Sequence, residues 1–79
     1  MMSAQGETVE PVAERARILS TREREIVALI ARGYSNQQIA SVLAISEQTV
    51  KNKLTVIFGK LNLRGRVRLA VFAVENRIE

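Results

Sequence analysis

The sequence predicts an all-α domain of four helices, packed as a small bundle around a central helix-turn-helix unit. Apolar residues recur at three- and four-residue spacing in four separate segments, which is the helical period. A serine that can cap a helix precedes three of these segments, and short connections separate them. The chain has 79 residues, enough for one domain with a single modest core.

The composition excludes several classes of function. The chain contains no Cys, no His and no Asp. Disulfide frameworks and the usual zinc sites are therefore excluded, and the side chains that most often serve in catalysis are missing or isolated. We expect no enzyme activity and no metal, cofactor or small-molecule ligand. No apolar run approaches the length of a membrane span and no signal-peptide pattern is present, so a cytoplasmic protein is expected.

Positive charge is concentrated in one part of the chain. The net charge is +4, from twelve Lys and Arg against eight acidic residues. Residues 46–68 carry six of these cations and one Glu, whereas residues 1–18 carry two Arg and three Glu. A cluster of this kind favours a polyanionic partner.

Residues 1–18 are expected to form a flexible tail, or a linker from an upstream domain, and the folded domain to cover residues 19–79. The first thirteen residues show no sustained period and contain Gly6 and Pro11. Helical structure is expected to begin no earlier than residues 14–18. The sequence leaves open whether the chain is whole or part of a larger protein.

The first helix is expected over residues 21–32. The Ser20 side chain can accept a hydrogen bond from the backbone amide of Glu23, and the Glu23 side chain can accept one from the backbone amide of Ser20. This reciprocal pair is a capping box. Gly33 can take the left-handed conformation that ends such a helix. We interpret this helix as scaffold.

The second helix is expected over residues 36–43. Ser35 and Gln38 form another capping box. Only residues 44–46 separate its end from the next helical segment. Two helices joined by so short a turn predict a helix-turn-helix unit.

The third helix, expected over about residues 47–61, is the candidate functional element. Ser46 caps it and Asn62 is expected to end it in the left-handed conformation. Its apolar seam faces the core, while the other side carries short polar groups flanked by two lysines. Short amides and hydroxyls suit hydrogen bonding to base edges in a DNA major groove, and lysines reach phosphates. These outward residues are Gln48, Lys51, Asn52, Lys53, Thr55 and Val56; the alternative is an ordinary amphipathic surface helix.

The fourth helix, expected over about residues 66–77, has two apolar stripes on nearly opposite sides. The first stripe is expected to close the core and contains Val67, Ala70, Val71, Val74 and Ile78. The second is expected to face outward and pair with a second copy, and contains Leu69, Phe72 and Ala73, with Asn76 at its polar end. The alternative is that both stripes join one core covered by the N-terminal segment.

Five separated motifs together resemble the LuxR-type (GerE-like) helix-turn-helix domain, as found in NarL/FixJ response regulators and in stand-alone GerE. They are L-S-T-R-E-R-E-I, S-N-Q-Q-I-A, I-S-E-Q-T-V-K-N, K-L and R-V-R-L-A-V, and they span about residues 19–75. The resemblance implies a four-helix bacterial transcription factor domain. It also implies DNA binding through the third helix, as a dimer formed through the last helix.

The resemblance also implies roles for single residues. Lys51 and Asn52 are expected to contact bases or backbone, and Thr55 is a further contact position. At the helix start, the residues expected to contact the DNA backbone are Ser46, Gln48 and Thr49. Lys53 stands where the family usually has His, which adds a cation, and Thr55 stands where many relatives are basic.

The predicted function is that of a transcriptional regulator with duplex DNA as its partner, a second copy as its dimer mate and RNA polymerase as a further candidate partner. A promoter-reading domain of a sigma factor is a near alternative, although the doubly apolar last helix argues against it. A different class is an interaction module that sequesters related factors through the fourth helix. The basic third helix disfavours that class, because such a role does not require lysines beside short polar groups.

Overall fold

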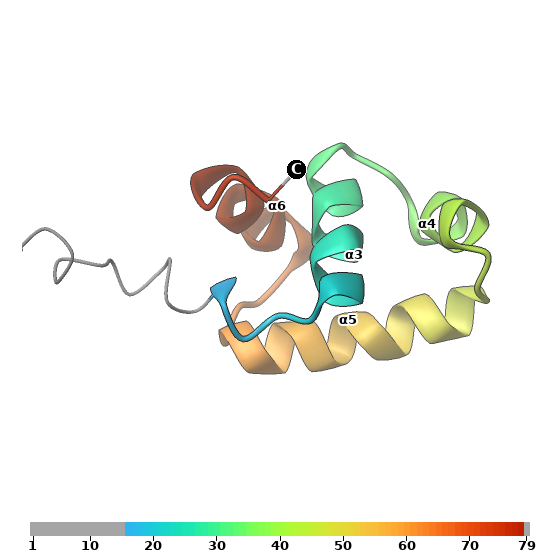
Figure 1. Ribbon diagram of the computed structural model, residues 1–79, viewed down its shortest axis with the longest axis horizontal. Helices are drawn as coiled ribbons and strands as arrows, with labels where there is room; N and C mark the ends of the chain where they lie inside the picture. The colour runs from blue at the N-terminus through green and yellow to red at the C-terminus, as the bar shows by residue number, and fades with distance from the viewer. Residues whose placement is uncertain (1–15, 79) are drawn as a thin grey trace, which may run out of the picture.

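The computed structural model describes residues 16–78, which contain four helices and no strand (Figure 1). The helices are α3 (Thr21–Ala31), α4 (Asn36–Leu43), α5 (Glu47–Leu61) and α6 (Arg66–Glu75). The predicted all-α, four-helix fold is confirmed. The prediction of a flexible tail concerns mostly residues 1–15, which lie outside the described residues.

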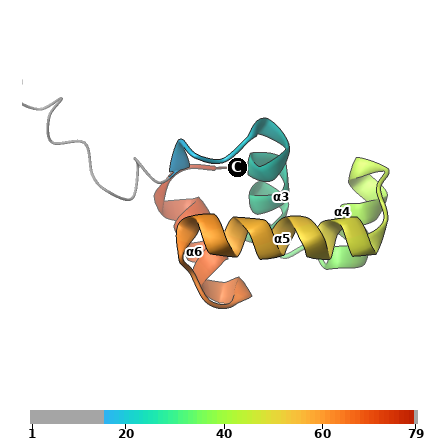
Figure 2. The same cartoon turned by 90° about the horizontal axis from the view of Figure 1, so that it is seen from below.

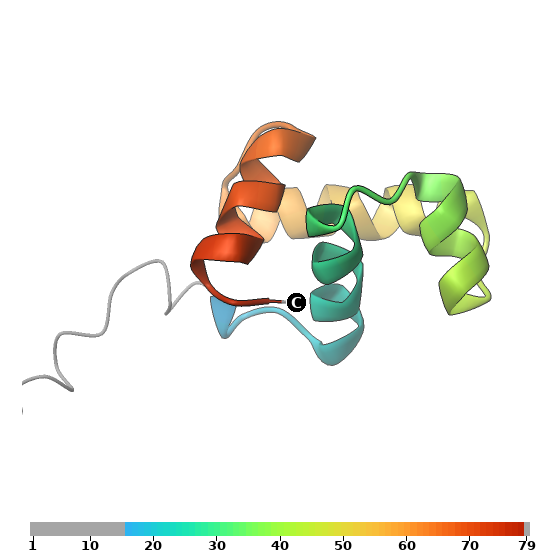
Figure 3. The ribbon, with the colours of Figure 1, turned by 90° about the horizontal axis from the view of Figure 1, so that it is seen from above.

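The longest helix, α5, runs along one side of the domain, and the other three helices lie against it or beside it. In Figure 3, α3 stands between α6 and α4, and α5 crosses behind all three. The packing is closest between α3 and α6 and between α4 and α5, and α3 also contacts α5. The helix-turn-helix pair α4–α5 is therefore joined to the rest of the domain mainly through α3.

Local capping explains where the first two helices begin. Ser20 Oγ accepts from the Glu23 amide at 3.1 Å, and Glu23 Oε1 accepts from the Ser20 amide at 2.8 Å. Ser35 and Gln38 form the same pair of bonds, at 3.1 and 2.8 Å. Both predicted capping boxes are confirmed.

Left-handed residues end the helices. Gly33 (φ 88°) follows α3, and the Tyr34 amide donates to the Leu29 carbonyl at 3.1 Å. Asn62 (φ 54°) ends α5, as predicted. The turn of the helix-turn-helix unit uses Ala44 (φ 58°), which was not predicted because alanine rarely adopts this conformation.

A single hydrophobic core fills the space between the helices. Its largest fully buried side chains come from all four helices: Ile26, Val27, Ile39, Val50, Ile57, Leu61 and Leu69. The core also includes Ala16 and Leu19. It therefore begins slightly before residue 19, the expected start of the domain.

The orientation predicted for α6 was wrong. Leu69 and Ala73 are fully buried and Phe72 is 4 % exposed, so the stripe assigned to a dimer interface lies inside the domain. The three valines of the stripe assigned to the core face solvent instead, with exposed fractions of 77 % for Val67 and 62 % for Val74. Ile78 of that stripe is buried, as predicted, and Ala70 packs against the core. The larger Leu and Phe side chains remove more apolar surface from water than valines do, which favours the observed rotation of the helix.

Asn76 was expected at the polar end of that interface, and it has a local role in the structure. It is the residue that follows α6, and it is only partly exposed. Its Nδ2 donates to the Phe72 carbonyl at 2.9 Å, which satisfies a backbone acceptor at the helix end.

One buried charge links α3 to α5. Glu23 is 6 % exposed, and its Oε1 accepts from Lys60 Nζ at 2.8 Å. Burial acts to raise the pKa of Glu23, but the hydrogen bond and charge of Lys60, together with the Ser20 amide, outweigh it and lower the pKa below its ordinary value. Lys60 also donates to the Ile18 carbonyl at 3.3 Å, so its ammonium joins three parts of the chain.

None of the helices within residues 16–78 has both the length and the apolar content needed to cross a membrane.

Candidate nucleic-acid interface

The outer side of α5 is not covered by any other described element. Figure 2 shows this helix in front of the rest of the domain along its whole length. Its inner side is anchored by four buried residues, Val50, Leu54, Ile57 and Leu61. Six of the seven predicted DNA-contact residues are exposed and Thr49 is half-buried; they lie on α5 or at its cap: Ser46, Gln48, Thr49, Lys51, Asn52, Lys53 and Thr55. The structure therefore brings these candidates together on one surface.

The start of α5 is ordered by hydroxyl groups. Ser46 Oγ accepts from the Thr49 amide at 3.0 Å and lies 2.8 Å from Thr49 Oγ1. When Ser46 donates in that second bond, the hydroxyl hydrogen of Thr49 stays free for an outside acceptor. Free amides and hydroxyls at the positive end of a helix dipole form a suitable place for a phosphate.

Two amide side chains are paired one turn further on. Gln48 Nε2 donates to Asn52 Oδ1 at 3.0 Å, across the i, i+4 spacing of the helix. A carbonyl oxygen accepts two hydrogen bonds, so Asn52 can keep this bond and still accept from a base while its own NH2 group donates. The pair orients Asn52 outward, as recognition of adenine N6 and N7 requires.

Thr55 presents an acceptor and a methyl group to solvent. Its Oγ1 donates to the Lys51 carbonyl at 3.1 Å, within the same helix. The hydroxyl hydrogen is thereby used, and the lone pairs of the oxygen remain available. Thr55 is thus suited to accept from a base donor rather than to bind phosphate.

Lys51 and Lys53 supply the positive charge of this surface. Neither forms a salt bridge with any described residue, whereas Lys60 on the same helix is bound to Glu23. Unpaired exposed ammonium groups retain their full attraction for phosphates. The lysines therefore differ in role: Lys60 holds the fold together, and the other two are available to a ligand.

A shallow hollow of about 330 Å³ lies along one edge of α5. It is lined by Glu23, Thr49, Asn52, Lys53 and Val56. Three of these residues are predicted DNA contacts. The helical period predicts an outward position for Val56, but its side chain lacks the hydrogen-bonding or charged group that marks the predicted contact residues.

Arg66 links the start of α6 to the start of α4. Its Nη1 donates to Asn36 Oδ1 at 2.7 Å and its Nη2 to the Tyr34 carbonyl at 2.6 Å. No local sequence pattern predicts this contact, because thirty residues separate Arg66 from Asn36. Through it, the helix that follows α5 supports the helix that precedes it.

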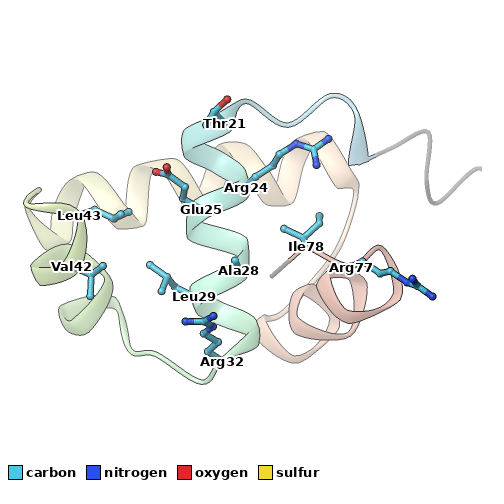
Figure 4. A pocket seen from close by; sticks show the side chains of 10 residues that line it. All are labelled: Thr21, Arg24, Glu25, Ala28, Leu29, Arg32, Val42, Leu43, Arg77 and Ile78. Atoms are coloured by element: carbon cyan, nitrogen blue, oxygen red, sulfur yellow. The ribbon is translucent and has the colours of Figure 1, made fainter.

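A second hollow, of about 490 Å³, lies on the solvent side of α3 (Figure 4). It is lined in part by Leu29 of α3 and its C-cap Arg32, by Val42 and Leu43 of α4, and by Ile78. Figure 4 shows α5 behind α3 in this view, so the hollow opens away from the predicted DNA-contact surface. It contains none of the candidate contact residues.

The chain is similar to known bacterial regulators over most of its length. Residues 17–73 match the family described as "Bacterial regulatory proteins, luxR family". The chain is 40 % identical over 73 residues to the oxygen regulatory protein NreC of Staphylococcus carnosus, covering 92 % of this chain and 34 % of NreC. It is 41 % identical over 66 residues to the response regulator protein VraR of Staphylococcus aureus, covering 84 % of this chain and 32 % of VraR.

The chain thus spans about a third of the length of these curated relatives. The matched residues contain all four helices except the last two residues of α6. The family comprises transcription regulators and is not a class of enzymes. This chain belongs to the LuxR family of bacterial regulatory proteins and carries the helix-turn-helix DNA-binding domain of that family.

Proposed function

We propose that this domain binds duplex DNA sequence-specifically, with α5 in the major groove, and so regulates transcription in the bacterial cytoplasm. The observation that carries the proposal is the outer side of α5, where short polar side chains and two unpaired lysines stand on a helix anchored by four buried residues. A major groove admits one α-helix, and amides and hydroxyls match the donors and acceptors of base edges.

The contacts divide into two kinds. Asn52, Lys51 and Thr55 are proposed to read bases, because they occupy the outward side and their free groups suit base edges. Ser46, Gln48, Thr49 and Lys53 are proposed to approach the DNA backbone, from the helix start and the flank of α5. Backbone contacts give affinity and orientation, whereas base contacts give specificity.

We further propose that two copies bind together through the exposed stripe of α6. Val67, Val71 and Val74 recur at helical spacing and are 77, 48 and 62 % exposed. This stripe replaces the buried residues first assigned to the interface. The surface area buried between one pair of helices is near or below the lower limit for stable complexes, about 1,200 Å². We therefore expect the two copies to pair mainly when they are bound to DNA. RNA polymerase is the further protein partner proposed for a regulator of this kind.

Selection of bound sites from random duplexes tests the proposal. We expect enrichment of an inverted repeat with half-sites about one helical turn apart, because two-fold symmetry of the protein imposes symmetry on the site. Enrichment of no sequence at all would contradict sequence-specific binding.

Substitution of Asn52 tests how the sequence is read. Asn52→Ala should weaken binding to the selected site by about 1–3 kcal/mol and relax the preference at one position of each half-site, while binding to random DNA changes little. Fluorescence anisotropy with both duplexes measures the difference. Arg32→Ala is the matched control, because Arg32 is exposed on the opposite side of α3. Equal losses on both duplexes would exclude base reading by Asn52.

A further inference from the structure

Val56 is an apolar residue in the middle of an otherwise polar surface. It is 49 % exposed and lines the 330 Å³ hollow together with Asn52, Thr49 and Lys53. It lies one helical turn beyond Asn52 and next to Thr55 in the chain. The residues that anchor α5, among them Ile57, lie on the other side of the helix.

The domain gains little from a valine at this position. Valine loses side-chain freedom in a helix and forms helix less readily than alanine does. About half of the Val56 surface stays in contact with water, so the domain obtains only part of the stabilisation that full burial would give. Single exposed apolar residues are common on proteins, so it is the location of Val56 among the predicted base contacts that is informative.

The major groove offers one apolar group among the base edges, the C5-methyl group of thymine. The isopropyl group of valine can cover this methyl group and exclude water from it. The other bases present hydrogen-bonding edges in the groove, which an apolar side chain cannot satisfy. An outward valine on a helix in this groove therefore prefers thymine.

The position of that thymine follows from the two helical repeats. One turn of α5 advances about 5.4 Å, and successive nucleotides of one strand are about 3.4 Å apart along the DNA axis. Val56 would thus lie one or two base pairs from the base that Asn52 contacts.

We propose that Val56 is a specificity-determining residue that selects a thymine one or two base pairs from the base contacted by Asn52, through its C5-methyl group. This inference rests on the proposed function, in which the outer side of α5 enters the major groove. It adds an apolar contact with the DNA to the hydrogen bonds and phosphate contacts proposed above.

The test removes the methyl group from the DNA and the isopropyl group from the protein. Each thymine of the selected half-site is replaced singly by deoxyuridine, which lacks only the C5-methyl group. Wild-type protein should lose about threefold to fivefold in affinity at one such position, as expected for one buried methyl group. Val56→Ala should bind the thymine and deoxyuridine duplexes equally, with unchanged affinity for random DNA and unchanged far-UV circular dichroism.

Val42→Ala is the matched control, because Val42 is another exposed valine (57 %) but lines the hollow on the opposite side. It should keep the wild-type ratio between the two duplexes. The inference is overturned if the wild type tolerates deoxyuridine at every position, if Val56→Ala keeps the wild-type ratio, or if the selected half-site has no thymine within two base pairs of the position that Asn52→Ala relaxes. Failure to select any site would overturn the proposed function together with this inference.

Discussion

Some residues of α5 stabilise the domain, and others remain available to bind DNA. The lysines show this difference most clearly. Lys60 Nζ lies 2.8 Å from a buried carboxylate oxygen of Glu23, while Lys53 has no ion-pair partner among the described residues. The two lysines lie on the same flank of one helix. Their substitution should therefore affect different properties of the protein.

Replacement of Lys53 should affect affinity for DNA and its dependence on salt. A lysine at a phosphate releases one counterion on binding, so Lys53→Ala should flatten the slope of log affinity against log salt by about 0.9. The loss should be similar on the selected site and on random DNA, because phosphates carry no sequence information. Anisotropy titrations at several salt concentrations measure the slope. An unchanged slope would place Lys53 away from phosphate.

Replacement of Lys60 should affect stability in a pH-dependent way. Lys60→Met leaves the Glu23 carboxylate buried with fewer partners, which should lower the free energy of unfolding at pH 7 by about 1–3 kcal/mol. The pKa of Glu23 is lowered in the folded state, so its stabilising contribution is complete above the ordinary value of 4.5 and is lost as the pH falls through the lowered pKa. The wild type and the variant should therefore converge in acid.

Urea unfolding between pH 3 and 7 measures this convergence. Arg22→Met is the matched control, because Arg22 and Glu25 form an exposed pair at 3.5 Å that should contribute at most about 0.5 kcal/mol. A difference between wild type and Lys60→Met that stays constant with pH would show that the loss comes from packing rather than from the charge of Glu23.

Among the four helices described, α6 has apolar residues both on its buried side and on its exposed side. Its inner side contributes Leu69, Phe72 and Ala73 to the core, and its outer side presents three exposed valines. Its first residue, Arg66, also bonds the start of α4. One short helix thus completes the core, supports the helix-turn-helix unit and offers a surface to a second copy.

A pair of substitutions on α6 separates these roles. Phe72→Glu buries a charge in the core and should lower the free energy of unfolding by more than about 3 kcal/mol. Val71→Glu places its charge on a half-exposed side, so the fold and half-site binding should persist while cooperative binding to the full site is lost. Thermal unfolding and gel shifts on full and half-sites measure the two effects. Full-site binding of Val71→Glu with wild-type cooperativity would exclude this stripe as the dimer contact.

At the scale of the whole molecule, the domain presents two different surfaces on opposite sides of α3. The outer side of α5 is polar and basic, and the 490 Å³ hollow lies on the far side of α3 (Figures 2 and 4). The exposed valines of α6 form a third surface. DNA on α5 would therefore leave the α3 hollow uncovered, because α3 and the core lie between the two.

Local features of this chain could be predicted well from sequence. The capping boxes at Ser20 and Ser35 and the left-handed Asn62 each depend on residues three or four positions apart, so the helix bounds agree within two residues with those expected. The outward side of α5 was equally predictable, because only one side of that helix is apolar. Six of the seven predicted contact residues are accordingly exposed, and Thr49 is half-buried.

Features that depend on distant segments required the three-dimensional structure. The helical period of α6 predicts two apolar stripes but does not indicate which of them is buried. Leu69 and Phe72 are buried, and the valines exposed, because of the way α6 packs on α3. The Lys60–Glu23 and Arg66–Asn36 contacts join residues 37 and 30 positions apart, and no local pattern encodes them. Periodicity and caps are properties of neighbouring residues, whereas burial and pairing depend on which surfaces the folded chain brings together.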